Sequence, residues 1–348
     1  MTMPETKPAV TGEPEIHAEQ VRSGDRFQFG ANWQRFLRLL DDRRIEIAVQ
    51  SLRSMLEVDR LDGRTFLDAG SGSGLFSLAA RRLGAHVTSF DFDPQSVACT
   101  KELRRRYFPD DHRWVVAEGS VLDEAYVEGL GRFDVVYSWG VLHHTGSMWR
   151  AIDITQRAVA LGGRFFIALY NDQDRRSVGW RYLKRLYCSG AIGRTFVTAV
   201  CVPGFVFRQL ISDLVRAKNP LAHYRNYRIN RGMSVVRDWV DWLGGYPFEV
   251  ATPTATFDFL RKRGFKLDRL VTTLGSGCNE FVFTREREVP PARTSNLDFA
   301  APVLGPPTRR GCETLHPSTA RDPGGPCRSH RAVPWNPSAN SLHLRLIT

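Results

Sequence analysis

Short apolar runs alternate with amphipathic stretches through the first half of the chain. Runs typical of buried strands lie at 65–69, 86–90, 114–117, 133–138 and 164–170. Between the first two, apolar side chains from Ser73 to Leu83 recur on one helical face, and Gly84 provides a stop. Asp93-Pro94 is a capping pair that opens a second helix. Strands that alternate with helices predict βαβ units and a mostly parallel sheet.

The pattern changes on both sides of this unit. Apolar residues between 25 and 60 recur near helical spacing, whereas residues 1–24 are polar and predict a flexible arm. Residues 173–250 are rich in Arg, Lys, Trp and Tyr and favour helices. The closing elements are a helix at 254–263 and strands at 265–271 and 279–284. The short Gly-containing connection between these two strands predicts an antiparallel end to the sheet.

The expected organisation has six segments. They are the arm 1–24, a helical segment or lid 25–60, an α/β core 61–172, a helical insertion 173–250, closing core elements 251–286 and a tail 287–348. The tail combines Pro-Pro, Gly-Pro-Pro and Pro-Gly-Gly-Pro runs with many Ser and Arg residues and has no periodicity. Such a composition predicts disorder, and its abrupt start also fits an aberrant, frame-shifted end.

The composition narrows the range of partners without choosing among them. The 348 residues are 42% apolar, enough for a sizeable core, and carry a formal net charge of +11. This surplus attracts nucleic acid, a membrane surface or acidic substrates. The six cysteines form no CxxC pair and have no His at metal-ligand spacing, which favours reduced thiols and no metal site. Without an apolar signal region or a run near the ~20 residues of a membrane span, we expect a cytoplasmic protein.

A glycine-rich turn joins the first predicted strand to the first helix. Gly70, Gly72 and Gly74 let the backbone approach a ligand closely, and the helix N-terminus offers free N–H groups. Asp91 ends the second strand, where a carboxylate can accept hydrogen bonds from ribose hydroxyls, and Phe92 is placed to face an adenine ring. NAD is the competing ligand. A leucine stands where the dinucleotide fingerprint requires its last glycine, and no second mononucleotide-binding half follows.

Five stretches, taken in this order, resemble class I S-adenosylmethionine (SAM)-dependent methyltransferases. They are Leu67-Asp68-Ala69-Gly70-Ser71-Gly72-Ser73-Gly74, Val87-Thr88-Ser89-Phe90-Asp91, Gly119-Ser120-Val121-Leu122-Asp123, Phe133-Asp134-Val135-Val136-Tyr137-Ser138 and Leu161-Gly162-Gly163. The resemblance covers residues 62–172 and 254–284 and is strongest to the small-molecule methylases of ubiquinone and menaquinone biosynthesis. It implies a Rossmann-like α/β fold, a seven-stranded sheet with an antiparallel last strand, and SAM as the cofactor.

The resemblance also implies the contacts to the methyl donor. The implied cofactor-binding residues are Asp68, Gly70, Gly72, Gly74, Asp91, Phe92, Ser120, Val121 and Ser138. The glycines would line the methionine part of SAM, Asp68 would orient its amino group, and Asp91 would hold the ribose. Ser120 and Val121 would flank the adenine. Many members carry an acidic residue where Ser120 stands, so this contact departs from the family pattern.

The fourth strand leads into a loop with two adjacent histidines, His143 and His144. Ligands of open α/β sheets sit at the carboxyl ends of the strands, so this loop is expected beside the donor methyl group. A similar Leu-His-His stretch occurs in the quinone-methylase group. Either one histidine removes a substrate proton or fixes the substrate, or one packs against or caps the next helix. Trp139, Tyr170 and Asn171 lie at the same rim and either line the acceptor pocket or are ordinary strand-end residues.

The helical insertion is expected to cap the substrate. Its apolar stretch 194–208 is interrupted by Pro203-Gly204 and is short for a bilayer span, so it is either a buried core helix or a peripheral membrane contact. Five basic residues lie nearby, namely Arg175, Arg176, Arg181, Lys184 and Arg185. Such a run is typical of a solvated face, or it binds an anionic substrate or membrane. The segment 27–33 is a candidate lid over the donor.

These inferences predict an enzyme that transfers a methyl group from SAM to an oxygen, carbon or nitrogen of a small, hydrophobic or lipid-like molecule. One alternative is a non-catalytic SAM-binding scaffold, and the complete glycine loop with Asp91 argues against it. Another is an RNA methyltransferase, which only the charge favours. The Asn/Asp-Pro-Pro-Tyr signature of enzymes that methylate base amino groups is absent, so nucleic acid is not the expected partner. The sequence indicates no oligomeric state.

Overall fold

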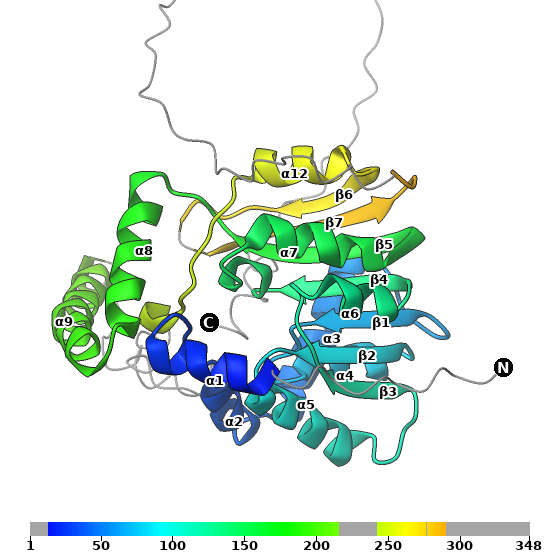
Figure 1. Ribbon diagram of the computed structural model, residues 1–348, viewed down its shortest axis with the longest axis horizontal. Helices are drawn as coiled ribbons and strands as arrows, with labels where there is room; N and C mark the ends of the chain where they lie inside the picture. Colours follow the sequence, from blue (N-terminus) through cyan, green and yellow to red (C-terminus); the bar gives the residue numbers. More distant parts are fainter. Residues whose placement is uncertain (1–12, 216–241, 276, 290–348) are drawn as a thin grey trace, which may run out of the picture.

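The computed structural model describes residues 13–215, 242–275 and 277–289, which are built on a seven-stranded sheet (Figure 1). The strands are β1 (Thr65–Ala69), β2 (His86–Asp91), β3 (Trp114–Glu118), β4 (Phe133–Trp139), β5 (Val159–Tyr170), β6 (Phe265–Val271) and β7 (Cys278–Arg285). Their order is β3-β2-β1-β4-β5-β7-β6. Strands β1 to β5 are parallel, and β7 is antiparallel to both β5 and β6. The expected Rossmann-like fold with an antiparallel last strand is confirmed.

Helices cover both faces of this sheet (Figure 1). The core helices are α3 (Asp42–Leu56), α4 (Leu75–Arg82), α5 (Pro94–Tyr107), α6 (Glu124–Gly129), α7 (Met148–Thr155) and α12 (Pro253–Arg261), with 3-10 turns η1 (Leu142–His144) and η2 (Gln156–Ala158). Ile45 of α3 and Leu78 of α4 pack with Phe66 on one face. Ile152 of α7 packs with Leu67 on the other face. Neighbouring strand residues point to opposite faces, so a fully buried parallel strand such as β1 is apolar throughout most of its length.

Local sequence explains where these helices begin. The Asp93 carboxylate accepts a hydrogen bond from the Gln95 N–H at 2.8 Å and caps α5, with Pro94 at its first position, as the sequence predicts. Asp123 caps α6 in the same way, accepting from the Tyr126 N–H at 3.0 Å. Both caps satisfy N–H groups that a helix leaves without intrahelical partners.

Two local predictions differ from the structure. Residues 13–23, expected to belong to a flexible arm, form α1 (Glu13–Ser23), whose polar sequence lacks the apolar stripe that would have identified it. Strand β5 begins at Val159, because the predicted turn at Gly162-Gly163 is absorbed into a continuous strand. Gly162 has a φ of +74°, and the pairing with β4 shifts register there, which is how a bulge accommodates extra residues.

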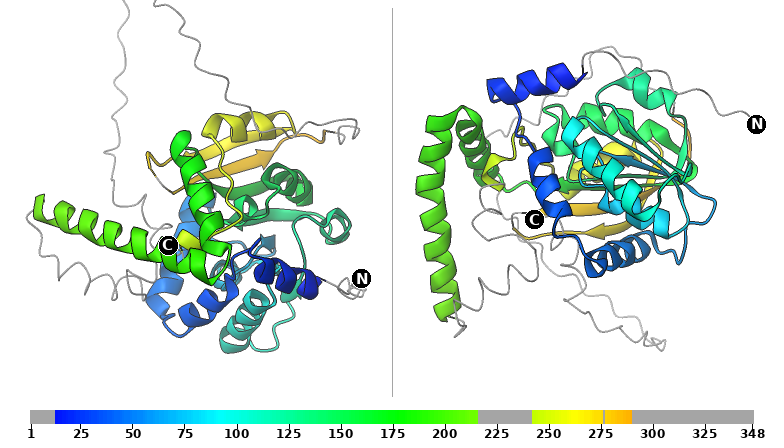
Figure 2. Two further views of the ribbon diagram at one scale, coloured as in Figure 1. Left: turned by 60° about the vertical axis from the view of Figure 1, so that its left-hand side comes forward. Right: turned by 90° about the horizontal axis from the view of Figure 1, so that it is seen from below.

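The insertion lies beyond the carboxyl ends of the parallel strands, where α8 (Arg175–Cys188) and α9 (Ala191–Val215) stand side by side (Figures 1 and 2). Tyr187 and Val197 are buried between them together with Leu243. Helix α9 runs through Pro203 without interruption for 25 residues, so the expected break at Pro203-Gly204 is wrong. Its stretch Ala191–Arg208 is long and apolar enough to cross a membrane by length and composition, contrary to our expectation, and 11% of it is buried. Residues 216–241 and the tail from residue 290 lie outside the described residues.

Candidate functional site

The glycine-rich turn between β1 and α4 adopts a conformation that requires its glycines. Gly70, Gly72 and Gly74 have φ values of +88°, +54° and +79°, in the left-handed region that disfavours other residues. The N–H groups of Gly70 and Ser71 donate to the Phe90 carbonyl at 2.9 and 3.0 Å, which fixes the turn to the end of β2. A Cβ on Gly70 would overlap the Val141 side chain, so the turn also lies directly beneath the histidine loop.

Asp91 occupies the end of β2, as the sequence predicts. One carboxylate oxygen accepts from the Gly72 N–H at 2.8 Å and the other from the Asp93 N–H at 2.9 Å. Burial raises the pKa of Asp91 to about 6, against the effect of these two backbone donors. Each carboxylate oxygen accepts two hydrogen bonds, so both retain a lone pair for the hydroxyls of a ribose. The geometry of the glycine turn and the carboxylate therefore fits the nucleoside of SAM.

Asp68 lies behind the glycine turn and is 1% exposed. Its carboxylate accepts from the Ser77 hydroxyl at 2.5 Å, and a chain of buried hydroxyls continues through Ser89 to the indole N–H of Trp114. Burial raises the pKa of Asp68 to about 7, and the nearby charge of Asp91 adds to this effect. The structure places Asp68 in a polar chain of the core, and its contact with the donor amino group stays a prediction.

The residues predicted to contact the adenine make contacts within the fold, and their contacts with the donor stay predictions. Phe92 is half-buried between the His17 ring, with centroids 5.4 Å apart, and the Arg26 guanidinium, 5.0 Å from its ring centroid. Ser120 accepts from the Leu122 N–H at 3.1 Å, which stabilises its own turn. Val121 beside it is buried, as is Ser138. The Ser138 hydroxyl donates to the Ala69 carbonyl at 2.8 Å, so its side chain joins β1 to β4.

The two histidines follow β4 in the turn η1, and their rings are tilted by 57° with centroids 4.5 Å apart. His144 Nδ1 lies 2.6 Å from the Pro247 carbonyl oxygen. Because a carbonyl only accepts, this contact assigns the proton to Nδ1 and leaves the lone pair on Nε2. Burial, reinforced by the charges of Lys184 and Arg26, lowers the pKa of His144 to about 3. The His144 imidazole is therefore neutral at physiological pH.

His143 is fully buried, and its ring centroid lies 4.0 Å from that of Tyr170. Burial holds its pKa well below the usual value for a histidine. Trp139 packs into the core on the α3 and α4 side of the sheet, where its indole hydrogen-bonds the Glu280 carboxylate. Asn171 uses both ends of its amide in the loop around β7, donating to the Thr273 carbonyl at 3.1 Å and accepting from the Asn279 side chain at 3.0 Å. Tyr170 thus adjoins the histidines, whereas Trp139 and Asn171 make internal contacts.

The segment containing α1 and α2 (Gly30–Leu37) covers the donor side of the site. The Gly30 N–H donates to Asp93 at 2.7 Å, and a Cβ on Gly72 would lie 3.0 Å from the Trp33 ring. Arg26 spans the two halves of the site, because its guanidinium lies over Phe92 and donates to the His144 carbonyl at 3.2 Å. The contacts agree with a lid at 27–33, and the lid function stays a prediction.

Sequence reasoning missed several residues that the structure brings to this site, namely His17, Arg26, Asp93 and Pro247. Asp93 was identified only as a helix cap. Its second carboxylate oxygen, which accepts from Gly30, serves a contact between segments far apart in sequence. Arg26 is adjacent to the predicted lid, which is the single signal that could have indicated it. Nothing in the local sequence marks Pro247, whose carbonyl determines the His144 tautomer.

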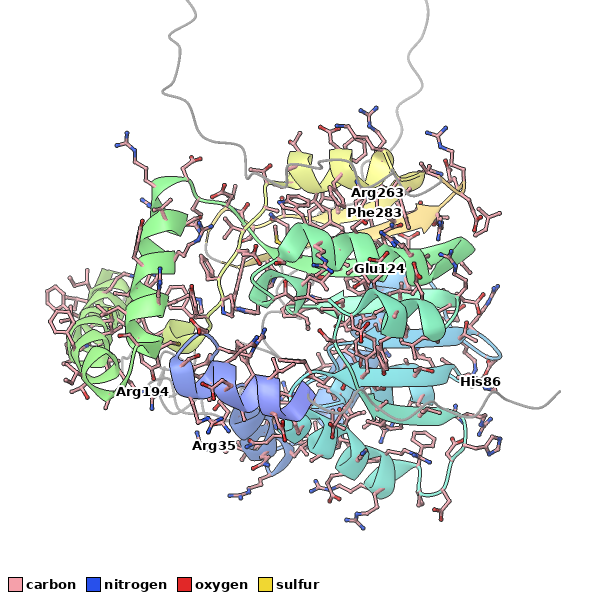
Figure 3. The ribbon with its side chains drawn as sticks, viewed as in Figure 1. Arg35, His86, Glu124, Arg194, Arg263 and Phe283 are labelled. Carbon is pink, nitrogen blue, oxygen red and sulfur yellow. The ribbon has the colours of Figure 1, made fainter. Side chains whose placement is uncertain are left out.

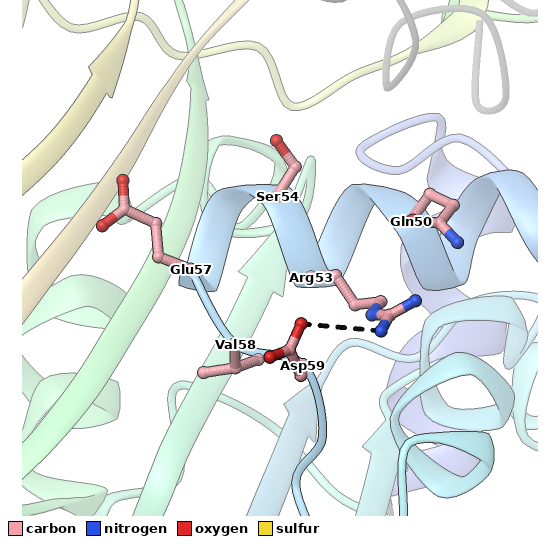
Figure 4. A pocket seen from close by; sticks show the side chains of 6 residues that line it. All are labelled: Gln50, Arg53, Ser54, Glu57, Val58 and Asp59. Atoms are coloured by element: carbon pink, nitrogen blue, oxygen red, sulfur yellow. Dashed lines mark ion pairs between the residues drawn. The ribbon is translucent and has the colours of Figure 1, made fainter.

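A shallow hollow beside α3 is separate from this site (Figure 4). It is lined by Gln50, Arg53, Ser54, Glu57, Val58 and Asp59. The ion pair between Arg53 and Asp59, 3.6 Å apart, closes one side. No part of it touches the glycine turn or the histidines. In the part of the chain that the structure describes, no group of three or more His, Cys, Asp and Glu side chains is arranged to hold a metal ion.

The strand order, the left-handed glycine turn and the carboxylate at the end of β2 define a nucleoside-binding domain of the class I methyltransferase type. Comparisons with known proteins identify the family. A family model described as "Methyltransferase domain" matches residues 34–192. The ubiquinone biosynthesis O-methyltransferase of Methylobacterium nodulans is 34% identical over 193 residues, which cover 47% of this chain and 75% of that protein. The chain belongs to the SAM-dependent methyltransferase family.

Other relatives align over shorter segments. Ubiquinone biosynthesis O-methyltransferases of Methylobacterium sp. and Xanthomonas oryzae are 32% and 30% identical over 34% and 38% of this chain. The chain spans 46% and 56% of the length of these two relatives. Among solved structures, magnesium protoporphyrin IX methyltransferase from Synechocystis with bound SAH has a TM-score of 0.45 at 14% identity, covering 78% of this chain and 99% of that one.

Proposed function

We propose that this protein transfers the methyl group of SAM to a hydroxyl oxygen of a small, largely hydrophobic molecule. The observation that carries the proposal is the state of His144. Its Nδ1–H is fixed on Pro247, which leaves the lone pair on Nε2, and its loop is joined to the donor side through Arg26. A hydroxyl is a weak nucleophile until a base accepts its proton, and a neutral imidazole supplies such a base. The names of the O-methyltransferase relatives support the same choice of acceptor atom.

The donor is proposed to lie along the glycine turn, with its ribose on Asp91 and its adenine beside Phe92 and Val121. When bound, SAM supplies an activated methyl group on a positively charged sulfur. The protein's own task is alignment, because the reaction is an in-line displacement that depends on the approach of the nucleophile. Trp33 of the lid and the adjacent Arg26 would exclude water from this approach.

His144 Nε2 accepts the proton of the acceptor hydroxyl in this proposal. The oxygen lone pair forms the new O–C bond as the C–S bond breaks, so the products are a methyl ether, S-adenosylhomocysteine and one proton, which leaves through His144. His143 and Tyr170 would form the wall behind the acceptor. Their tilted, closely packed rings suit an aromatic or otherwise apolar part of the acceptor.

Calorimetric titration with S-adenosylhomocysteine tests the donor site. Wild-type protein should bind it with micromolar affinity, and Asp91→Ala should weaken binding at least tenfold because the ribose loses its acceptors. A matched Asp59→Ala variant, changed at an exposed carboxylate, should bind like wild type. Tight binding by Asp91→Ala, or binding of NADH in place of S-adenosylhomocysteine, would contradict the donor assignment. Methylation of a panel of phenols with isotope-labelled SAM then tests the acceptor class.

Two other functions are less well supported. A non-catalytic scaffold would not need the fixed tautomer of His144, and turnover of any phenol would exclude it. An RNA methyltransferase would show RNA retention that falls steeply with salt, because phosphate contacts release counterions. Retention that does not depend on salt would exclude that alternative.

We propose further that α9 lies on an anionic membrane surface. One face of α9 packs on α8 through Val197, so the helix stays attached to the fold. The other face is exposed, with Ile192 88%, Phe207 66% and Leu214 79% accessible. Arg194, at the α9 end of the molecule in Figure 3, is exposed and suits anionic headgroups. Cosedimentation with vesicles containing phosphatidylglycerol should retain the wild type, and Phe207→Asp with Leu214→Asp should abolish retention.

A further inference from the structure

Lys184 differs from the other basic residues of its cluster. Four of the five, Arg175, Arg176, Arg181 and Arg185, are exposed at the surface of α8, as expected of a solvated face. Lys184 is completely buried and points from α8 toward the histidine loop. From the sequence alone, Lys184 could not be distinguished from its basic neighbours, because its burial depends on segments that lie elsewhere in the chain.

The ammonium group of Lys184 is held by neutral groups. Its Nζ donates to the Trp242 carbonyl and lies 5.1 Å from the ring centroids of both Trp242 and Phe248. None of the described carboxylates forms an ion pair with it, and the Glu249 carboxylate accepts instead from the Met148 N–H at 3.0 Å. An ammonium has three donors, and a buried charge is costly without a counter-charge. Burial accordingly lowers the pKa of Lys184 to about 7.

Gly245 shows how close this ammonium is to the proposed base. A Cβ on Gly245 would lie 3.2 Å from Cε1 of His144, 3.4 Å from Nζ of Lys184 and 3.7 Å from the Phe29 ring. The base, the ammonium and a lid aromatic thus surround one point, which the glycine leaves without a side chain. The His144 ring and the Lys184 ammonium are therefore near enough for one small molecule to contact both.

We infer that Lys184 binds a carboxylate of the acceptor, so that the methylated molecule is a hydroxy acid whose hydroxyl lies on His144. The inference rests on the function proposed above and names its substrate class. The incoming carboxylate supplies the counter-charge that the described residues lack, while Trp242, Phe248 and Phe29 contact the apolar body of the molecule. Lys184 is a specificity-determining residue in this arrangement and takes no part in the transfer of the proton or the methyl group.

Matched pairs of acceptors test this inference. The probes are hydroxybenzoates and dihydroxybenzoates, each with its carboxamide, which has the same shape and no charge. In the presence of S-adenosylhomocysteine, calorimetry should show at least one acid binding tenfold more tightly than its amide. Lys184→Met should remove this preference and leave the affinity for S-adenosylhomocysteine within twofold. Arg185→Met, an exposed neighbour on the same helix, should retain both.

The outcomes separate this inference from the proposed function. Binding of S-adenosylhomocysteine without preference for any acid over its amide would overturn the carboxylate assignment and leave the donor site intact. Preference for an acid that persists in Lys184→Met would also overturn it, by placing the carboxylate elsewhere. Loss of S-adenosylhomocysteine binding in the wild type would contradict the proposed function itself. If Lys184→Met fails to fold, the same comparison of acid and amide binding can be made between Lys184→Gln and the wild type. For an acid that is methylated, Lys184→Met should raise KM tenfold or more with kcat changed less than threefold.

Discussion

At the scale of single residues, the state of His144 leads to a prediction about pH. An ordinary histidine base, with a pKa of about 6.5, loses activity as the pH falls through that value. Burial lowers the pKa of His144 to about 3, so it remains neutral well below pH 6.5. We expect kcat to stay level from pH 8 down to about pH 5.5, and His144→Gln to reduce it about 10²- to 10⁴-fold. Initial rates with labelled SAM across this pH range check both.

Two variants make the His144 measurement specific. His86→Gln changes an exposed histidine at the amino end of β2, far from the site (Figure 3), and should leave kcat unchanged. His144→Gln should bind S-adenosylhomocysteine as the wild type does, because no donor contact is altered. A drop in wild-type kcat centred near pH 6.5 would contradict the lowered pKa of His144, and full activity in His144→Gln would show that another group accepts the proton.

Asp68 provides a second residue-scale prediction, on stability. Its folded-state pKa is raised from 3.8 to about 7, so the folded state binds the proton more tightly than the unfolded state. The corresponding stabilisation is present at low pH and is lost as the pH rises from about 4 to 7. Asp68→Asn cannot ionise. Its free energy of unfolding, relative to that of the wild type, should therefore increase by on the order of 1 to 3 kcal/mol between pH 5 and pH 8. Urea unfolding at the two pH values measures this gain, and an equal difference at both would refute it.

At the scale of elements, the sequence predicts the strands well because a parallel strand buried on both faces is an unmistakable apolar run. Strands β1 to β4 and β6 to β7 match their predicted positions within one residue. The failures have local causes. Helix α1 is polar and is held by contacts to a distant loop, and α9 continues through Pro203 because it is long enough to tolerate one lost hydrogen bond.

The same reasoning explains which site residues could be predicted. Gly70, Gly72 and Asp91 are adjacent to strand ends, so chain order alone brings them together. Arg26 was not assignable, and Lys184 could be named only as one of a basic cluster, since both meet the site through segments that lie far apart in sequence. Too many small polar side chains were assigned to the cofactor and substrate sites. Ser138, Ser120 and Asn171 sit at the correct strand ends, but each makes hydrogen bonds within the fold.

Asp93 connects two elements, and this double role can be measured. It caps α5 and also accepts from the Gly30 N–H at the start of α2, with His17 of α1 3.7 Å away. Asp93→Ala should cost about 1 kcal/mol for the lost cap, with a further cost for the unpaired Gly30 N–H. It should also loosen α1 and α2. Trypsin should therefore cleave the variant faster than wild type after Arg22, Arg26 or Arg35.

Asp123 offers a matched control for this experiment. It caps α6 through the Tyr126 N–H and, among the described residues, forms no hydrogen bond or ion pair with α1 or α2. Asp123→Ala should lose a similar cap energy in urea unfolding without faster cleavage between residues 13 and 40. Equal cleavage in the two variants would mean that general destabilisation, and not release of the lid, exposes the segment.

At the scale of the whole molecule, two segments that lie far apart in the sequence, one before and one after the central strands, close over the carboxyl ends of these strands. The N-terminal segment covers the donor side, and the cap of α8 with residues 242–249 covers the acceptor side (Figures 1 and 2). They meet where the Phe27 N–H donates to the Tyr246 carbonyl at 2.8 Å and Phe27 packs against Tyr187. Binding of the donor should therefore stabilise both segments.

Hydrogen exchange with and without S-adenosylhomocysteine measures this connection. A donor held beneath Trp33 and Arg26 should slow exchange in the turn 70–74, in the lid 26–37 and also in residues 242–249, because the lid and the cap share hydrogen bonds and packed rings. Helix α12, on the far edge of the sheet, should exchange at an unchanged rate and serves as the internal control. Protection confined to 70–74 would mean that the donor binds without the lid. Protection of the lid without residues 242–249 would mean that donor binding does not order the acceptor side. The two substrates could then bind in either order.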